Sequence, residues 1–290
     1  MIVVRLYGGL GNQLFQYSAA RKLAIKLNCE VILDTSEFDK PRIFGTKREF
    51  ELMNFQIAGR LPTNIEEKKI RIQLHKVFGK MPFVRPYSFL KEKSLYKFDE
   101  RFNRVNGRIY MDGYWQSYKY FENIRDVLIN EFQPNFQISQ IAKNFYSEMK
   151  DVNSVALHVR RGDYVSDIKT ATYHGICGLE YFNAAIKIIK SKIDRPVFYI
   201  FSDDIEWASK YIKIESEKYF MNNHVMKFSP SQDLLLMASC KHQVIANSSF
   251  SWWSAWLNNN KSKFVIYPGD WLKNSRVDLS DLIPNDWHKT

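Results

Sequence analysis

Cysteine is scarce in this chain, and no cysteine pair has the spacing of a disulfide framework or a zinc site. The 290 residues hold three cysteines, which are widely separated: Cys29, Cys177 and Cys240. We therefore expect reduced thiols and a cytoplasmic protein. No apolar run approaches the roughly 20 residues of a membrane-spanning helix, and the first residues lack the apolar core of a signal peptide. These absences argue against a secreted or membrane-spanning protein.

The sequence also has no D-x-D pair of the kind that binds a divalent ion, no repeat of solenoid length and no low-complexity tract. A metal is therefore not required by the sequence, and we expect no cofactor. A hydrophobic content of 45% and a charged content of 25% are ordinary for a soluble globular protein. The length suffices for two domains of ordinary size.

Positive charge is in excess and is concentrated in one stretch. Of the net charge of +11, residues 60–125 contribute +8, from 15 Lys and Arg against 7 Asp and Glu. Within it, basic residues surround four apolar residues at helical spacing: Ile70, Leu74, Val77 and Phe78. This pattern is typical of a surface helix with a buried stripe, of a helix that lies on a membrane, or of a nucleic-acid contact. No recognisable nucleic-acid-binding motif accompanies it, so we expect no nucleic-acid partner.

Strands and helices alternate along the chain. The opening predicts a parallel βαβ unit with strands at 2–7 and 30–34, whereas four prolines interrupt residues 40–110 and Pro134 breaks the helical stretch at 120–150. From residue 151, strands at 154–160, 197–201, 243–246 and 264–267 alternate with helices near 179–192, 205–219, 231–240 and 250–258. This order predicts an α/β protein with parallel sheets covered by helices on both faces. We expect two Rossmann-like halves, split near residue 150, with a cleft between them.

A polar cluster ends the apolar strand at 154–160. Side chains alternate along a strand, so His158 and Arg160 project to one face while Arg161 and Asp163 point to the other. In open α/β sheets, ligands bind beyond the carboxyl ends of the strands, where these residues lie. Two adjacent guanidinium groups suit a ligand with two or more negative oxygens. The alternative is a surface ion-pair cluster in which Asp163 neutralises an arginine.

The glycine turn at residues 8–11 departs from the dinucleotide-binding fingerprint. Leu14 stands where the fingerprint has its last glycine, although Asp34 lies near the distance expected for a ribose contact. An oxidoreductase that binds a nicotinamide or flavin cofactor is therefore an alternative function. Gly11 lets the backbone approach a ligand, and Asn12 at the helix start can present its amide to one. The other interpretation makes Asn12 a plain N-cap.

A serine-rich segment, residues 247–253, follows the strand at 243–246 and opens a helix. Free N–H groups at a helix start and serine hydroxyls form an anion site of the kind that phosphates occupy. Asn247 or Ser248 is alternatively a plain N-cap. The tryptophans of this helix are most simply core residues: Trp252, Trp253 and Trp256.

Acidic residues lie at two further positions. Asp203 and Asp204 follow the strand at 197–201, and Asp233 begins the helix near 231–240. The carboxylate of Asp233 can accept hydrogen bonds from a guanine base, although an Asp at a helix start is usually a cap. Three strand ends thus carry an Arg pair, an Asp pair and a serine-rich helix start. Together they favour a nucleoside diphosphate ligand.

Long segments of the chain resemble the bacterial α-1,2-fucosyltransferases of glycosyltransferase family 11: GGLGNQLFQYS at 8–18, HVRRGDY at 158–164, FSDD at 201–204, NSSFSWWSAWL at 247–257 and the shorter Gly113-Tyr-Trp-Gln116. The resemblance spans nearly the whole chain. It implies an α/β fold of the GT-B type, in which two Rossmann-like domains with parallel sheets face a central cleft. Residues 1–150 would form the acceptor-side domain and residues 151–290 the GDP-fucose-binding domain. It also implies the donor GDP-β-L-fucose, inversion to an α linkage and no metal.

The resemblance implies roles for individual residues. Arg160 matches the arginine that holds the donor β-phosphate, and Asn12 matches an amino-terminal asparagine that faces the donor, so we expect both to be catalytic. Arg161 and Asp163 would brace the loop, and Asp233 would read the guanine. The expected donor-binding residues are Gly11, His158, Arg161, Asp204, Asp233, Asn247, Ser248, Ser249 and Phe250.

The expected reaction is displacement of GDP by the 2-hydroxyl of a terminal galactose. Arg160 and the helix start at 248–250 would stabilise the negative charge that develops on the leaving group. Trp115 and Gln116 would contact the acceptor by stacking and hydrogen bonding, unless Trp115 is a plain core residue. A base must lie within hydrogen-bond reach of the hydroxyl. The β-phosphate itself is one candidate, and nearby side chains are the others: Asp163, Asp167 and His174.

A bacterial enzyme that builds a surface glycan such as an O-antigen would take a galactose-terminated oligosaccharide on a lipid carrier as its acceptor. Such an enzyme works at the anionic inner leaflet, where each basic residue of the stretch at 60–125 would contribute about 1 kcal/mol. We therefore expect a cytoplasmic protein, with peripheral contact to the inner membrane as a hypothesis. Besides the oxidoreductase, a non-catalytic glycan- or membrane-binding module stays open as an alternative.

Overall fold

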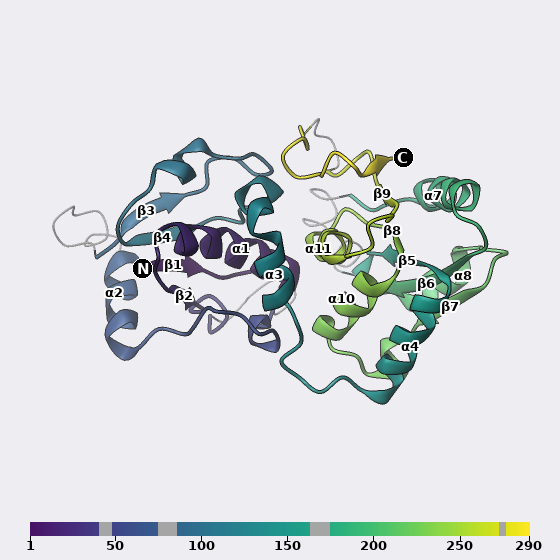
Figure 1. The fold of residues 1–290 in the computed structure, drawn as a ribbon, viewed down its shortest axis with the longest axis horizontal. Coiled ribbons are helices and arrows are strands. Elements are labelled where there is room, and N and C mark those ends of the chain that lie inside the picture. The colour runs from purple at the N-terminus through teal and green to yellow at the C-terminus, as the bar shows by residue number, and fades with distance from the viewer. Residues whose placement is uncertain (41–47, 75–85, 163–174, 273–276) are drawn as a thin grey trace. The chain divides into compact units, whose positions relative to one another are not determined.

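The computed structural model describes residues 1–40, 48–74, 86–162, 175–272 and 277–290, which form two compact units (Figure 1). Among the described residues, the first unit holds 1–40, 48–74, 86–135 and 278–284, and the second holds 136–162, 175–272, 277 and 285–290. The division falls after residue 135 and not near 150, because helix α4 (Gln140–Asp151) packs on helix α10 (Pro230–Ser239) of the second unit. Each unit is a separate α/β structure.

The first unit is built on a four-stranded parallel sheet. Its strands lie in the order β2 (Val31–Asp34), β1 (Ile2–Arg5), β4 (Ile109–Asp112) and β3 (Ser88–Lys91). Ile2 is in register with both Val31 and Ile109, and Ser88 is in register with Ile109. Strands β3 and β4 come from the proline-interrupted region, where the sequence analysis did not identify them.

Helices cover both faces of this sheet. Helix α1 (Leu10–Lys26) begins after Gly8, whose φ of +81° favours glycine, and contacts β1 and β2. On the other face, Ile70 of α2 (Asn64–Leu74) joins a core cluster with Val3 and Tyr110. The described residues of the unit also include α3 (Arg125–Glu131) and short 3₁₀ helices at Leu52–Asn54, Glu100–Arg104, Tyr118–Tyr120 and Glu122–Ile124.

The second unit is built on a six-stranded parallel sheet. Its strands lie in the order β10 (His288–Lys289), β9 (Val265–Tyr267), β8 (His242–Val244), β5 (Asn153–Val159), β6 (Pro196–Ser202) and β7 (Lys218–Met221). The helices among its described residues are α4, α7 (Leu179–Lys192), α8 (Ile205–Tyr211), α9 (Asn223–Met226), α10 and α11 (Ser249–Leu257). Two parallel sheets with helices confirm the predicted α/β class. The prediction of a helix over 205–219 is wrong in its second half, because α8 ends at Tyr211 and strand β7 begins at Lys218.

The central strand β5 has side chains on two faces. Val155, Leu157 and Val159 lie in one core cluster with α7 and α8, whereas Ala156 lies in another with α4 and α10. His158 shares the second face with Ala156 because side chains alternate along a strand. The polar end of β5 is therefore held between two packed layers.

Helix α11 is buried from Ser251 to Leu257. The exposed fractions of Trp252, Trp253 and Trp256 are 0%, 0% and 5%, and the three rings contact one another. The interpretation of these tryptophans as core residues is confirmed.

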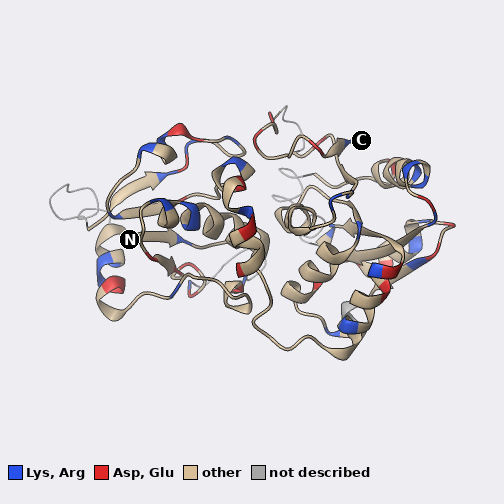
Figure 2. Ribbon diagram, in the orientation of Figure 1, with Lys and Arg blue, Asp and Glu red and all other residues tan. Residues whose placement is uncertain are grey.

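The basic stretch contains the surface helix α2, which ends at Leu74, while Val77 and Phe78 lie outside the described residues. Arg60 is paired with Glu30 and Glu66. Figure 2 shows Lys and Arg distributed over both units and interspersed with Asp and Glu. Within the described part of the chain, no helix combines the length and hydrophobicity needed to cross a bilayer.

Ile189→Ala tests the core of the second unit. Ile189 of α7 is 0% exposed, so truncation should lower the free energy of unfolding by about 2–5 kcal/mol. The control Val225→Ala removes an apolar side chain that is 74% exposed and should change it by less than about 0.5 kcal/mol. Urea unfolding followed by tryptophan fluorescence measures both. Equal midpoints for the two variants would contradict the placement of Ile189 in the core.

Candidate functional site

The loop after β5 is tied to the end of β6 by one carboxylate. Oδ2 of Asp203 lies 2.7 Å from Nη1 of Arg160, and Oδ1 accepts a 2.7 Å hydrogen bond from the backbone N–H of Arg161. A methyl group at Gly162 would lie 2.8 Å from Oδ2 of Asp203, so a side chain there would have to displace this carboxylate. Asp203 therefore holds Arg160 and Arg161 and lies close to Gly162. Asp203 was not among the predicted site residues, although its position at the end of a strand is visible in the sequence.

Arg161 turns away from this contact. Its guanidinium carbon lies 3.9 Å from the ring centroid of Trp207, and its Nε is 3.6 Å from Oδ2 of Asp204. Asp204 caps helix α8 by accepting a hydrogen bond from the backbone N–H of Trp207 at 3.1 Å. These contacts hold Arg161 beside α8 and give Asp204 the structural role of a helix cap. The roles expected of the two residues in bracing the loop and binding the donor stay predictions.

His158 lies close to the charged side chains of Asp203 and Arg160. It is 5% exposed, and its ring centroid is 5.7 Å from that of Phe250 at the start of α11. Burial lowers the pKa of His158 to about 4; the charge of Asp203 opposes this shift and that of Arg160 adds to it. The imidazole is therefore neutral at pH 7. Its Nδ1 is buried without a hydrogen-bond partner among the described residues.

The start of α11 has no side-chain cap. Ser248 occupies the N-cap position, but its hydroxyl does not bond to a first-turn N–H. Asn247 is buried and is not the cap. Its Nδ2 donates to the carbonyl oxygens of Gly175 and Trp271, and its Oδ1 accepts from Sγ of Cys177. Asn247 therefore positions the chain that leads into α11, whose positive dipole end suits an anion.

Asp233 lies one turn inside α10. Ser229 caps this helix by accepting from the N–H of Gln232 at 3.2 Å, and Pro230 is the first helical residue. The interpretation of Asp233 as a cap is therefore wrong. Its role in reading guanine stays a prediction.

In the first unit, Asn12 and Gln116 meet. Oδ1 of Asn12 accepts a hydrogen bond from Nε2 of Gln116 at 2.8 Å, although 104 residues separate them in the chain. Gly9 is the N-cap of α1, so the interpretation of Asn12 as a cap is wrong. Gly11 lies buried in the first turn of the same helix.

Trp115 does not reach a ligand surface. Its exposed fraction is 0%, and its ring contacts those of Phe102 and Tyr120. The prediction that it stacks on the acceptor is therefore wrong, because no face of the indole is accessible.

Asp34 is also buried: it is 2% exposed and accepts hydrogen bonds from the hydroxyl of Tyr110 and the backbone N–H of Ser36. This removes the ribose contact on which the oxidoreductase alternative depended.

The three side-chain base candidates, Asp163, Asp167 and His174, lie outside the described residues. Among the residues that are described, no three His, Cys, Asp or Glu side chains group as metal ligands.

Comparison with known proteins places the chain in a class of enzymes. Residues 1–288 match the sequence model of glycosyl transferase family 11. The chain therefore belongs to this family of glycosyltransferases, which confirms the resemblance found in the sequence.

Two proteins of Escherichia coli are similar over almost their whole length. The O-antigen biosynthesis glycosyltransferase WbnK is 33% identical over 97% of this chain and 98% of its own. An alpha-1,2-colitosyltransferase is 32% identical over 99% of this chain and 98% of its own. Among solved structures, Arabidopsis thaliana FUT1 in complex with GDP superimposes with a TM-score of 0.50 at 11% identity, over 92% of this chain and 70% of that one. This likeness shows the fold alone.

The burial of His158 predicts a low pKa in solution. In the unfolded chain the His158 imidazole becomes protonated near pH 6.5, whereas in the folded chain it becomes protonated only near pH 4. The contribution of His158 to stability is therefore complete above about pH 6.5 and is lost as the pH falls through 4. An NMR titration of the imidazole C–H, assigned with His158→Gln, measures this pKa. A value at or above 6.5 would show that the ring is solvated.

Proposed function

We propose that the protein transfers L-fucose from GDP-β-L-fucose to the 2-hydroxyl of a terminal β-galactose, with inversion, in the synthesis of a bacterial O-antigen or related surface glycan. The observation that carries this proposal is the cluster at the carboxyl edge of the second sheet. There Asp203 orients Arg160 beside His158, and the ring of Phe250, in the first turn of α11, contacts that of His158. The two E. coli relatives support the linkage and the pathway.

The chemistry explains why such a cluster is needed. Breaking the bond between C1 of fucose and the β-phosphate leaves positive charge on the sugar and adds negative charge to GDP. Arg160 and the amides of α11 would stabilise that negative charge without reorganising, because Asp203 and the sheet already hold them. Arg161 and Asp204 would act only through the loop that they brace.

No divalent ion is needed in this proposal, because Arg160 and the helix dipole supply the positive charge at the leaving group.

Asp233 would recognise guanine through its carboxylate, which can accept hydrogen bonds from both N1–H and the exocyclic amino group of the base. The acceptor would bind on the first unit, where the Asn12–Gln116 pair lies. Peripheral contact with the inner membrane stays a prediction from the charge of residues 60–125.

Colitosyl transfer is a second candidate, because a relative 32% identical to this chain carries that activity in its name. L-Colitose is L-fucose without the 3-hydroxyl. A site that hydrogen-bonds this hydroxyl discriminates strongly against the sugar that lacks it. Comparing kcat/KM for the two GDP-sugars decides between the donors: a preference for GDP-fucose supports the proposal, and a preference for GDP-colitose overturns it.

Arg160→Ala tests the leaving-group contact. With GDP-fucose and a β-galactoside, kcat should fall by at least about 10²–10³-fold, measured as acceptor-dependent release of GDP. Arg160→Lys should recover part of the loss, because it keeps the charge but not the planar fork. The control Arg195→Ala removes an arginine whose side chain is 91% exposed and should leave kcat unchanged. Near-normal turnover by a folded Arg160→Ala protein would refute the assignment, and a rate abolished by EDTA would refute metal independence.

Asp233→Ala tests the recognition of guanine. Loss of two hydrogen bonds to a carboxylate should reduce the preference for GDP over ADP by about 10- to 100-fold. Isothermal titration calorimetry with both nucleotides measures this ratio. An unchanged ratio would remove Asp233 from the guanine site, whatever its effect on turnover.

A further inference from the structure

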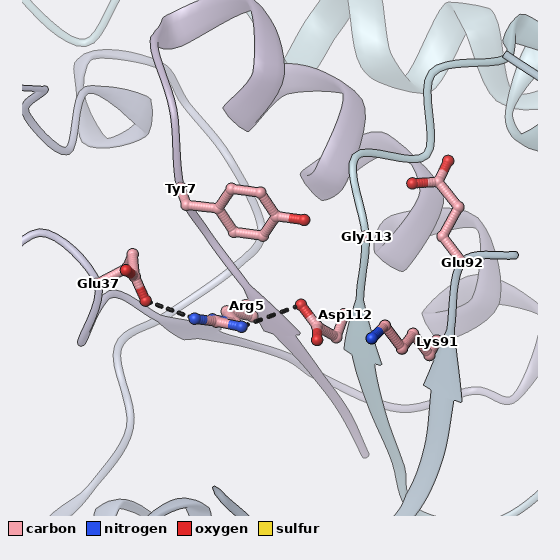
Figure 3. Close-up of a pocket in the computed structure, with 7 residues that line it drawn as sticks. All are labelled: Arg5, Tyr7, Glu37, Lys91, Glu92, Asp112 and Gly113. Carbon is pink, nitrogen blue, oxygen red and sulfur yellow. Dashed lines mark hydrogen bonds and ion pairs between the residues drawn. The ribbon is translucent and has the colours of Figure 1, made fainter. Parts of the chain in front are cut away.

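A pocket lies at the carboxyl edge of the first sheet. Its volume is about 390 Å³, within the range of small-molecule sites. All four strands contribute residues at or just beyond their carboxyl ends: Arg5, Tyr7, Glu37, Lys91, Glu92, Asp112 and Gly113 (Figure 3). In parallel sheets this edge is where ligands bind. None of these residues belongs to the set proposed above for the donor.

The polar groups of the pocket are of both signs. Figure 3 shows Arg5 between Glu37 and Asp112. Nη2 of Arg5 lies 2.5 Å from Oε2 of Glu37, and Nη1 lies 3.3 Å from Oδ1 of Asp112. Within the described residues, Glu37 meets Arg5 and Lys40 through Oε2 alone. Oε1 of Glu37 and Oδ2 of Asp112 are therefore acceptors that these contacts do not use.

This chemistry suits a neutral polyol. Three carboxylates disfavour a phosphate or sulfate, and the central guanidinium disfavours a cation. A sugar hydroxyl donates to a carboxylate and accepts from Arg5 or Lys91, so it can use groups of both signs. Tyr7 adds an aromatic surface against which the C–H groups of a sugar ring can pack. Burial raises the pKa of the Tyr7 phenol, so its hydroxyl stays a donor at neutral pH.

The pocket adjoins the Asn12–Gln116 pair through one loop. The ring of Tyr7 lies 4.7 Å from that of Tyr114, two residues before Gln116. Glu92 accepts hydrogen bonds from the backbone N–H groups of Tyr114 at 2.7 Å and of Trp115 at 3.0 Å. Trp115 has φ +57°, and consecutive amides in such a conformation form a concave anion site, filled here by Glu92. The same carboxylate that borders the pocket thus holds the loop that carries Gln116.

We propose that this pocket binds the terminal sugar of the acceptor, with Asp112 and Glu37 accepting its hydroxyl groups and Arg5 fixing both carboxylates. The identity of that sugar as a β-galactoside rests on the proposed function. The presence of a site for a neutral sugar at this edge does not depend on the proposed function, because it follows from the residues of the pocket alone. Asp112 and Glu37 are binding residues here, and Glu92 is a positioning residue.

The experiment compares Asp112→Asn and Glu37→Gln with Asp278→Asn. Asp278 is a matched control, because it is a carboxylate of the same unit that is paired with Lys97 outside the pocket. We expect the acceptor KM to rise at least about 10-fold in both pocket variants. The KM for the GDP-sugar and the Kd for GDP should stay within about 2-fold of the unaltered protein. Asp278→Asn should leave all three constants unchanged.

Saturation-transfer NMR with methyl β-D-galactoside tests binding without turnover. The unaltered protein and Asp278→Asn should give a signal that both pocket variants lose while their thermal unfolding stays cooperative. If one variant fails to fold, the other still decides the question. A pocket variant that keeps the signal and the acceptor KM, or that raises only the donor KM, overturns the proposal. Sugar binding that depends on the pocket in a protein that transfers neither fucose nor colitose would refute the proposed function and leave this site intact.

Discussion

The hydrogen-bonded ion pair of Asp203 governs the geometry at the carboxyl end of β5. One oxygen holds the guanidinium of Arg160 and the other holds the backbone N–H of Arg161. This arrangement sends Arg160 toward His158 and leaves Arg161 to stack on Trp207. A site that stabilises developing negative charge needs donors that are already in place, and the carboxylate of Asp203 supplies that order.

The first unit uses the same device. Glu92 follows β3 and accepts N–H groups from the loop after β4, just as Asp203 follows β6 and accepts an N–H from the loop after β5. Neighbouring parallel strands end at the same edge, so a carboxylate after one strand lies within reach of the loop after the next. For Glu92 the cost of burial outweighs the hydrogen bonds from the backbone N–H groups of Tyr114, Trp115 and Gln116, and it raises the pKa of this carboxyl to about 7.

Periodicity identified the long elements well. The helix expected near 179–192 is α7, Leu179–Lys192, and the strand at 154–160 is β5, Asn153–Val159. Two of the missed strands, β3 and β7, are short and have few buried side chains: one of the four residues is buried in each. Their extended conformation comes from pairing with β4 and β6, which no local pattern reports.

Family membership, the α/β class and the polar residues that follow the strands could all be deduced from the order of amino acids, because alternation and motif spacing are local properties. The order of amino acids does not reveal which side chains contact one another in the folded chain. Asp203 lies beside Arg160, Trp115 lies in the core, and Asn12 bonds to Gln116. Those pairings arise from the order of strands in the sheets, where β5 lies between β8 and β6 and β4 lies between β1 and β3. Strand order is set by packing across the whole unit, so contacts between residues 42 or 104 positions apart emerge only when the chain has folded.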